Sequence, residues 1–313
     1  MKGLVYKSTG LWYIVRGEDG LNWDVRIKGR FKTDSDISST NPLAVGDTVV
    51  FEIENRDTRT GTVTEIGDRY NYMVRVSPHN VNQKHIIAAN IDVAVIVASI
   101  ATPRTSRGFI DRFLVTAEAY HIPAIIIVNK ADLLTPKTDV ILKEWNAIYR
   151  TAGYEIYSVA ARLPESLTAI KDRLAGKTAL FSGHSGVGKS TLLNALVPGM
   201  IAKTKEVSGW SGKGQHTTTF AEMFDAPAGG KIIDTPGVKE FGIIDMEREE
   251  LSHYFPEMRA ILTECKFNNC LHMNEPGCAV KQGVMKGKIA AERYENYLTI
   301  LDSIGPKWKD LSK

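Results

Sequence analysis

The stretch GHSGVGKST at residues 183–191 decides the fold of this chain. An apolar run, TALFSG, precedes it and the helical pattern KSTLLNALV follows, so it lies between a strand and a helix. In this setting the pattern G-x4-G-K-[ST] predicts a phosphate-binding loop, with backbone N–H groups and a helix N-terminus facing the phosphates. The alternative is a glycine turn without a ligand, and the strand–helix setting argues against it. The candidate phosphate-binding residues are Gly183, His184, Ser185, Gly186, Val187, Gly188, Lys189, Ser190 and Thr191.

Two further features belong to the phosphate end of the same site. Lys189 is expected to reach the β- and γ-phosphates, and Ser190 to ligate a Mg²⁺ ion that arrives with the nucleotide. Asp234 ends the strand pattern KIIDT and begins the sequence DTPG, where a Mg²⁺-associated carboxylate is expected. Gly237 can offer its N–H to the γ-phosphate. D-x-x-G alone is a common turn, but here it follows a phosphate loop by about fifty residues.

The tetrapeptide Asn129-Lys130-Ala131-Asp132 predicts recognition of guanine. It follows the apolar strand pattern AIIIV, so it lies at the same sheet edge as the phosphate loop. The Asp132 carboxylate can accept from guanine N1–H and N2–H₂, whereas adenine would leave that carboxylate unpaired. Asn129 is expected to tie loops together, and the Lys130 stem to lie along the base. A second candidate contact, to guanine O6, is the backbone of the short segment Ser158, Val159 and Ala160.

These motifs occur in an unusual order. The base motif at 129–132 precedes the phosphate loop and D-x-x-G comes last, whereas in ordinary GTPases the phosphate loop comes first. Cutting the chain at one loop and joining it at another preserves every contact of a sheet, and chain ends that lie close together make this tolerable. We therefore predict a circularly permuted GTPase domain over residues 81–245. The loop after Asp234, which senses the γ-phosphate, then leads directly into the C-terminal domain.

The part of the chain from 91 to about 240 alternates strand and helix patterns. The strand patterns are IDVAVIVASI, AIIIV, EIYSV and TALFSG, and the helix patterns include RGFIDRFLVTAEAYHI, DVILKEWNAIYRTAG and a segment at about 164–175. TTTFAEMFDA and KIIDT indicate two more strands. Apolar strands that bracket amphipathic helices predict a mostly parallel sheet covered on both faces. The preceding residues 81–90 (VNQKHIIAAN) have the character of a short linker.

Residues 1–80 are expected to form a separate all-β domain. Short β-branched and aromatic runs alternate there with Gly, Asp and Asn clusters, namely LWYIVR, NWDVRI, DTVVFEIE, GTVTEI and NYMVRV. Five or six short strands in this length predict an OB-type barrel, a fold that often binds RNA. The alternative is a β-module that contacts only protein.

The C-terminal segment, residues 246–313, is expected to be mainly helical with a cysteine-bearing loop. All three cysteines of the chain lie there, in the pattern Cys265-x4-Cys270-x-His272-x5-Cys278. An odd number of clustered cysteines argues against a disulfide framework. Three thiolates and one imidazole predict one closed, tetrahedral, structural Zn²⁺ site. The alternative is that the three thiols are buried as small apolar side chains.

Composition excludes several classes of protein. The apolar fraction of 43% and the charged fraction of 24% are those of an ordinary globular protein. No apolar run approaches the roughly 20 residues that a membrane helix needs, and the N-terminus lacks the pattern of a secretory signal. We therefore expect a cytoplasmic protein without a membrane contact. Basic and acidic residues are equal in number in 1–80 and in 246–313, so any nucleic-acid surface is a local patch.

This order of motifs, with a β-module before it and a cysteine-containing domain after it, resembles the circularly permuted ribosome-assembly GTPases called RsgA or YjeQ. The resemblance covers nearly the whole chain and rests on the motifs at 129–132, 183–191, 212–219 (GKGQHTTT), 234–241 (DTPGVKEF) and 265–278. It implies slow intrinsic GTP hydrolysis, stimulation by the small ribosomal subunit and a role in the late maturation of that subunit. GTP, GDP, the subunit and its rRNA are then the expected partners, with other assembly factors as further candidates, and we expect a monomer.

The catalytic group must substitute for a glutamine that this chain lacks. Val238 follows the D-x-x-G glycine, where many GTPases carry a Gln that orients the attacking water. His216 is the nearest candidate, and the resemblance assigns a catalytic role to a His in this motif, although Gln215 stands where the family usually has Arg. The alternative is that His216 is a loop residue in contact with RNA or solvent. Either Thr217 or Thr218 is expected to complete the Mg²⁺ coordination.

Two other functional classes remain open at this stage. One is a GTP-gated binding module in which nucleotide occupancy, and not turnover, is the main output. The other is an ATP-dependent small-molecule kinase, which Asp132 disfavours. Several lysines are either rRNA phosphate contacts or parts of a solvated surface, namely Lys203, Lys205, Lys213, Lys281, Lys286 and Lys288.

Overall fold

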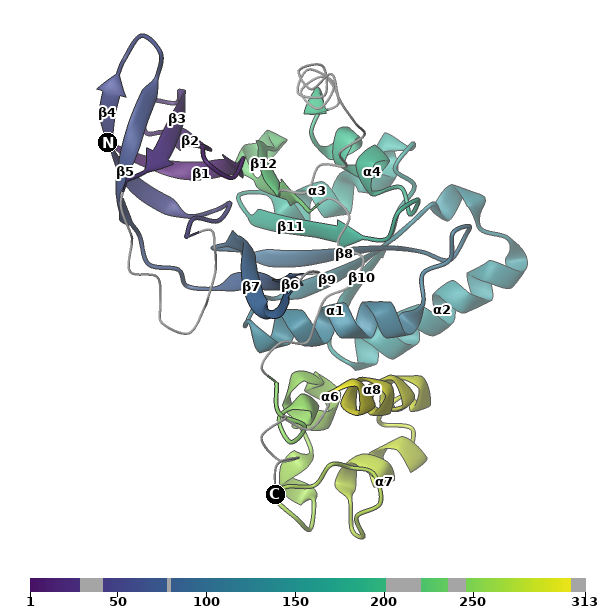
Figure 1. Ribbon diagram of the computed structural model, residues 1–313. Coiled ribbons are helices and arrows are strands. Elements are labelled where there is room, and N and C mark those ends of the chain that lie inside the picture. The colour runs from purple at the N-terminus through teal and green to yellow at the C-terminus, as the bar shows by residue number, and fades with distance from the viewer. Residues whose placement is uncertain (29–41, 78–79, 201–220, 236–245, 305–313) are drawn as a thin grey trace.

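A computed structural model of the chain places a β-barrel and a small helical region on two sides of a central sheet (Figure 1). It describes residues 1–28, 42–77, 80–200, 221–235 and 246–304, with side chains described throughout these ranges except at 75–84. Among these residues, no helix is both long enough and apolar enough to cross a membrane.

The first five strands close into a barrel. They are β1 (Lys2–Ser8), β2 (Tyr13–Gly17), β3 (Asn22–Ile27), β4 (Thr48–Asn55) and β5 (Thr60–Ile66). Their hydrogen-bonded order is β1-β2-β3-β5-β4, and β4 pairs back onto β1. Burial alternates along β3, where Trp23 and Val25 join Val15 and Phe51 in the barrel core. The predicted OB-type barrel is confirmed.

The next two strands form a separate hairpin, which corrects two predictions. β6 (Tyr72–Ser77) pairs with β7 (Asn80–Ala89) in a two-stranded sheet, so NYMVRV is not a barrel strand and the predicted linker at 81–90 is mostly strand. The strand that completes the barrel is β1, where the sequence patterns predict no strand. Such a hairpin is marginal alone. It is held by tertiary packing, because Met73 and Ala88 are buried in the core of the central sheet, and a short local pattern cannot reveal that contact.

The central sheet contains six strands. They are β8 (Val93–Ser99), β9 (Ala124–Asn129), β10 (Glu155–Ser158), β11 (Thr178–Gly183), β12 (Glu222–Asp225) and β13 (Lys231–Asp234). The order is β10-β9-β8-β11-β13-β12, in which the first five strands are parallel and β12 is antiparallel to β13. Every residue of β8 is buried, as expected for a strand covered on both faces. The predicted mostly parallel sheet is confirmed.

Two pairs of helices cover the two faces of this sheet (Figure 1). One face packs against α1 (Arg107–Ala119) and α2 (Pro136–Thr151), and the other against α3 (Thr168–Leu174) and α4 (Lys189–Leu196). Alternate residues of β8 belong to the two cores, with Ile96 on the α1 side and Val95 on the α4 side. These helices confirm the predicted pattern, and the predicted helix at about 164–175 is the 3₁₀ turn η2 (Pro164–Leu167) followed by α3. The other short turns of this part of the chain are η1 (Ala131–Leu133) and η3 (Pro227–Gly229).

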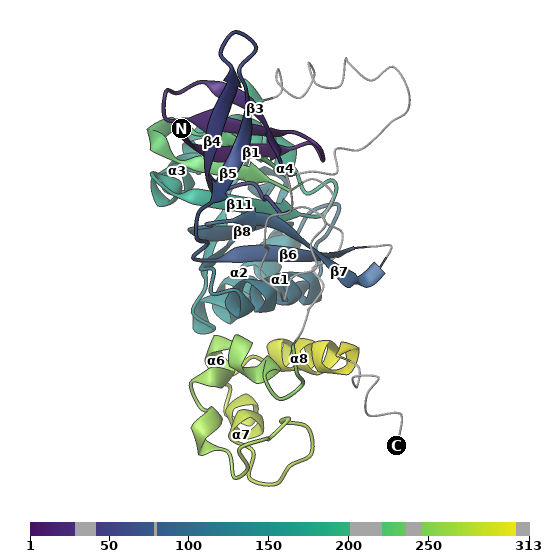
Figure 2. The same cartoon turned by 60° about the vertical axis from the view of Figure 1, so that its left-hand side comes forward.

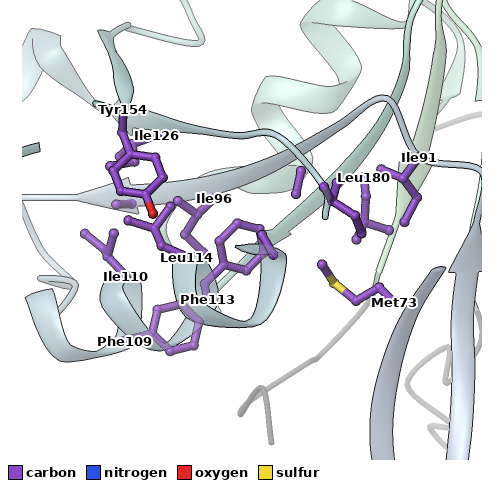
Figure 3. Packing of buried hydrophobic residues seen from close by; sticks show 14 of the residues in the cluster. Met73, Ile91, Ile96, Phe109, Ile110, Phe113, Leu114, Ile126, Tyr154 and Leu180 are labelled. Carbon is purple, nitrogen blue, oxygen red and sulfur yellow. The ribbon is translucent and has the colours of Figure 1, made fainter. Parts of the chain in front are cut away.

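Helix α1 is packed along the middle of the sheet (Figure 3). Ser106 caps its N-terminus by accepting a hydrogen bond from the Phe109 backbone N–H. Ile110, Phe113 and Leu114 are fully buried in the same core as the strand residues of β8 and β9. Because its apolar side chains enter the core over several turns, α1 is fixed against the sheet, and its remaining side faces the C-terminal region.

The C-terminal region, residues 246–304 of the described chain, lies against α1 in both views (Figures 1 and 2). Its elements are η4 (Leu251–Tyr254), α6 (Pro256–Arg259), η5 (Leu262–Glu264), α7 (Ala279–Met285) and α8 (Ala291–Ser303). Phe255, Tyr297 and Leu301 are fully buried in its core, together with Val115 of α1. The predicted helical region with a cysteine-bearing loop is confirmed, although only α8 exceeds two turns.

The barrel is joined to the central sheet at the edge formed by β12. β1 pairs antiparallel with β12 at Lys7 and Glu222, so that barrel and sheet form one continuous ladder of eleven strands. The Lys7 ammonium also donates to the Glu222 carboxylate at 2.9 Å. Beside this pair, the Tyr6 hydroxyl donates to the Asp225 carboxylate at 2.5 Å.

Candidate nucleotide site and metal centre

The loop between β11 and α4 has the backbone that a phosphate loop requires. Gly186 and Gly188 have φ of 83° and 89°, a left-handed conformation that favours glycine. A Cβ at Gly188 would lie 2.4 Å from the Asn129 side-chain nitrogen, so a larger residue would also collide with the base motif. Ser185 and Ser190 are exposed and Lys189 begins the helix. All nine candidate residues from 183 to 191 therefore lie in one strand–loop–helix unit.

Asn129 connects the base motif to this loop. Its side chain is buried, and its Nδ2 donates to the carbonyl oxygens of Val187 and Gly188 at 3.0 and 3.4 Å. Its Oδ1 accepts from the Ala161 backbone N–H at 3.1 Å. Three loops that are distant in the sequence are thus held together by one side chain, and replacing it would leave buried polar groups unpaired.

Lys130 makes a second bridge to the phosphate loop. Its ammonium donates to the carbonyl oxygens of Gly186 at 2.7 Å and Thr102 at 2.8 Å. Its backbone is left-handed, with φ of 66°. Thr102 belongs to the loop between β8 and α1, which none of the sequence motifs of the site includes. The available signal was its place at the carboxyl end of a central parallel strand, where ligands of such sheets bind.

The remaining candidates for the base are Asp132 and the segment 158–160. Asp132 is exposed in η1, so its carboxylate is accessible to a ligand. The Ala131 backbone N–H donates to the Val159 carbonyl at 3.0 Å, which brings the two predicted base-contact segments together. Ser158 is exposed, whereas Ala160 is buried and bonded through both backbone groups to the Ser166 hydroxyl.

The phosphate end of the site combines the groups expected to meet Mg²⁺. Asp234 ends β13 directly beside Phe181 of β11, and its carboxylate is bonded to the Lys189 ammonium. The exposed Ser190 hydroxyl lies one residue farther along the helix. A carboxylate and a hydroxyl are the hard oxygen ligands that Mg²⁺ prefers, so these residues fit the ion. His216, Thr217, Thr218 and Gly237 lie outside the described residues.

His184 links the phosphate loop to α1. Its imidazole and the Phe109 ring are 3.6 Å apart between centroids and tilted by 31°. Burial in this contact lowers the pKa of His184, because the charged imidazolium is less well solvated there. Neither Phe109 nor this contact could be found from local sequence, since the two residues are distant in the chain.

The four predicted metal ligands come together in the C-terminal region. Each of the four side chains offers one potential donor atom, and these four atoms all lie within 4.8 Å of one another. The residues are Cys265, Cys270, His272 and Cys278. His272 Nδ1 is 3.7 Å from the Cys265 sulfur and 3.4 Å from the Cys278 sulfur. Tetrahedral Zn²⁺ with Zn–S of about 2.3 Å separates its donors by about 3.8 Å. The cluster therefore fits one structural zinc ion.

The surroundings of the cluster support the same conclusion. Burial raises the pKa of Cys270 to about 12, so its thiolate form needs a nearby cation, which Zn²⁺ supplies. Backbone N–H groups of Ala279 and Lys281 point at sulfurs of the cluster. The hydroxyls of Tyr294 and Tyr297 on α8 donate to the carbonyl oxygens of His272 and Leu271. The ligand loop is thus held by α8 as well as by its own turns.

Among the lysines considered for rRNA, Lys281 donates to the Met273 carbonyl, Lys286 and Lys288 are exposed, and Lys203, Lys205 and Lys213 lie outside the described residues.

Comparison with known proteins gives consistent matches along the chain. A family described as RsgA GTPase matches residues 66–244, and one described as RsgA N-terminal domain matches residues 2–63. A protein of Christiangramia forsetii named small ribosomal subunit biogenesis GTPase RsgA is 48% identical over 303 residues, covering 96% of each chain. A protein of the same name from Flavobacterium psychrophilum is 50% identical, covering 96% of this chain and 93% of the relative.

Solved structures agree with these matches. YjeQ from Thermotoga maritima superposes with a TM-score of 0.77 at 31% identity, covering 98% of this chain and 99% of that one. YloQ, described as a circularly permuted GTPase, superposes with a TM-score of 0.74 at 33% identity, covering 98% and 96%.

Proposed function

The chain belongs to the RsgA family of GTPases, and from this membership we propose that it binds the small ribosomal subunit and assists the late maturation of that subunit. GTP hydrolysis is its reaction, slow for the protein alone and faster on the subunit. The observation that carries the proposal is the pair of bridges from Asn129 and Lys130 to the phosphate loop, which assemble a guanine site from permuted motifs. The small ribosomal subunit is proposed as the partner because the names of the relatives include it.

The residues of the site divide the work of binding. The Asp132 carboxylate accepts from guanine N1–H and N2–H₂, with the 158–160 segment beside the O6 edge. The amides of residues 183–191 and the Lys189 ammonium hold the phosphates, and the Lys189–Asp234 ion pair rearranges when they arrive. Mg²⁺, when bound with GTP, neutralises phosphate charge, and Ser190, Asp234 and either Thr217 or Thr218 are its proposed ligands. Gly237 is the proposed γ-phosphate sensor.

Hydrolysis requires a polar group to orient the water that attacks the γ-phosphate. Val238 cannot do this, which accounts for slow turnover by the protein alone. We propose that His216 takes this role when the subunit is bound. A GTP-gated module without relevant turnover is the alternative, and the GTPase names of its relatives do not favour it.

The decisive experiment measures single-turnover GTP cleavage with no addition, with small subunits and with large subunits. Stimulation by small subunits alone, by about a hundredfold or more, supports the proposal, since partner-supplied completion of GTPase sites has effects of that order or larger. His216→Ala should keep GTP affinity and lose the stimulation. Equal rates under all three conditions would refute the proposal that hydrolysis depends on the subunit. Full stimulation of the variant would refute the catalytic role of His216.

Base specificity gives an independent test. The protein with Mg²⁺ should bind GTP far more tightly than ATP, and Asp132→Ala should lower GTP affinity by about a hundredfold, because a buried polar edge of guanine loses its partner. Asp139→Ala is a matched control, since Asp139 is a half-exposed residue of α2 paired with Lys143. Equal affinities for GTP and ATP would refute the assigned guanine site.

The division of the chain is part of the same proposal. Residues 1–80 would contact RNA, 81–245 would bind and hydrolyse GTP, and 246–313 would hold the structural zinc and contribute rRNA contacts. We propose that the protein acts as a monomer in the cytoplasm, where subunits mature, with other assembly factors among its partners.

A further inference from the structure

We propose that α1 is a positioning element with contacts on two opposite sides, through which nucleotide in the phosphate loop strengthens the docking of the C-terminal region. The inference rests on the proposed binding of guanine nucleotide. It adds a route that differs from the covalent one, in which residues 236–245 lead from the D-x-x-G motif into that region. The new route runs across the folded structure, from His184 through α1 to α8.

The first contact of α1 is with the phosphate loop. His184 stacks on Phe109 in the first turn of the helix. The loop that precedes α1 adds two contacts: the Thr102 carbonyl accepts from Lys130, and the Pro103 ring would lie 3.0 Å from a Cβ at Gly186. A phosphate loop that is fixed by a ligand therefore also fixes the start of α1.

The second contact of α1 is a buried ion pair with α8. Asp111 and Arg293 of α8 are 0% and 1% exposed at their side chains, with 2.7 Å between Oδ1 and Nη1. The other oxygen of Asp111 accepts from the Asn296 amide at 2.5 Å. Arg293 also makes a two-fold contact with Glu257 of α6, at 2.7 and 3.0 Å. Because every charge in this group is buried, separating α1 from α8 would leave charges unpaired in the interior.

The two contacts belong to one turn of one helix. Phe109 and Asp111 are two residues apart, so their side chains leave the α-helix about 200° apart around its axis. One therefore meets the phosphate loop while the other meets α8. A displacement of this turn must either carry α8 with it or break the buried ion pair, and the second outcome is the costly one.

The other polar contacts between α1 and the C-terminal region are much more exposed. Arg107 approaches Glu292 at 3.2 Å, and Arg259 approaches Glu118 at 3.0 Å. Exposed pairs of this kind contribute little to stability. The Asp111–Arg293 pair is therefore the contact that carries the coupling. From Arg293 the route continues along α8 to Tyr297, whose hydroxyl holds the Leu271 carbonyl beside the metal ligand His272.

The experiment is amide hydrogen exchange of the full, zinc-containing protein with and without saturating GDP. Exchange in α8, at residues 291–303, should slow by at least about fivefold when GDP binds, the lower end of ordinary coupling between two sites. Phe109→Leu should reduce that effect to less than about twofold, with GDP raised to saturation as judged by a separate binding titration. Phe113→Leu is the matched control, because it makes the same change one turn farther along α1 in the core and should keep the full GDP effect.

A second variant covers the case in which Phe109→Leu folds poorly. Asp111→Asn keeps the size of the side chain but removes the charge that pairs with Arg293, and it should also lower the GDP effect on α8. Unchanged exchange of α8 in the parent protein, with GDP bound, overturns the inference. A full GDP effect in both variants overturns it as well, because the covalent route through residues 236–245 then suffices. Failure of GDP to bind in the titration would instead refute the proposed function.

Discussion

The barrel and the C-terminal region are attached to the same central domain in opposite ways. The barrel continues the sheet through one backbone pair at Lys7 and Glu222, whose side chains are 9% and 23% exposed, and its other ion pair joins Arg16 to an Asp225 that is 51% exposed. The C-terminal region is attached through Arg293, whose partners Asp111 and Glu257 are almost fully buried. Charges that remain near water can separate and re-form at little cost, whereas buried charges can separate only at a large one. The barrel attachment, in which one of the two ion pairs is hydrated, is therefore the easier of the two to adjust, and the C-terminal attachment is close to all-or-none.

Removal of the metal should produce the largest difference between the two attached regions. Stripping zinc with a chelator removes a contribution of about 10 kcal/mol or more to the folding of a small metal-bound unit. Amide exchange should then rise throughout residues 262–290 and in α8, while the barrel keeps its protection. Restoring Zn²⁺ is the control and should restore the exchange pattern. Protection of the C-terminal region that survives complete zinc removal would mean that the thiols act as packed apolar groups.

Arg293→Ala should have the next largest effect. It leaves Asp111 and Glu257 buried without their cation, and we expect a loss of about 3–5 kcal/mol in the free energy of unfolding of the C-terminal region. Denaturant titration followed by exchange in α8 measures it. The control Arg259→Ala breaks the more exposed pair with Glu118 and should cost about 1 kcal/mol or less. Equal losses in the two variants would contradict the contrast between buried and exposed attachment.

Tyr6→Phe should have the smallest effect of the three. It removes one hydrogen bond to Asp225 at the barrel junction, and we expect a loss of about 1 kcal/mol because that carboxylate is exposed and can be hydrated instead. Thermal unfolding with the barrel as reporter measures it. Tyr70→Phe is the control, since its hydroxyl reaches Asp92 only at 3.3 Å in an exposed position. A loss above that of Arg293→Ala would reverse the proposed order of the two attachments.

Periodicity and motif position were sufficient for the elements that carry their own signal. The β8 strand is a nearly continuous apolar run, β11 contains the apolar residues Ala179, Leu180 and Phe181, and the phosphate loop lies between a strand and a helix. These elements could therefore be placed from the sequence. The hairpin of β6 and β7 could not, because it depends on burial of Met73 and Ala88 against a core formed by other elements. A residue pattern reports local conformation and says little about which distant surface will cover it.

The same limit applies to the candidate site. Asn129 and the metal ligands were found because their residue types and spacings carry chemistry. Thr102 contributes only a backbone carbonyl, and Phe109 only a ring, so neither differs in sequence from an ordinary loop or core residue. The pairing of Asp111 with Arg293 joins α1 and α8, which are far apart in the chain. Such contacts follow from topology, which the sequence implies only through the whole fold.

The junction of β1 with β12 also affects solubility. Where a sheet ends in an uncovered strand, unpaired N–H and C=O groups are a template for another chain, and proteins shorten or cover such edges to avoid aggregation. At one end of the central sheet, β10 is only four residues long. At the other end, β12 is equally short, and β1 pairs with it at Glu222. A fragment that begins after the barrel would lose this pairing and should self-associate more than the intact chain, so the barrel also limits aggregation of its neighbour.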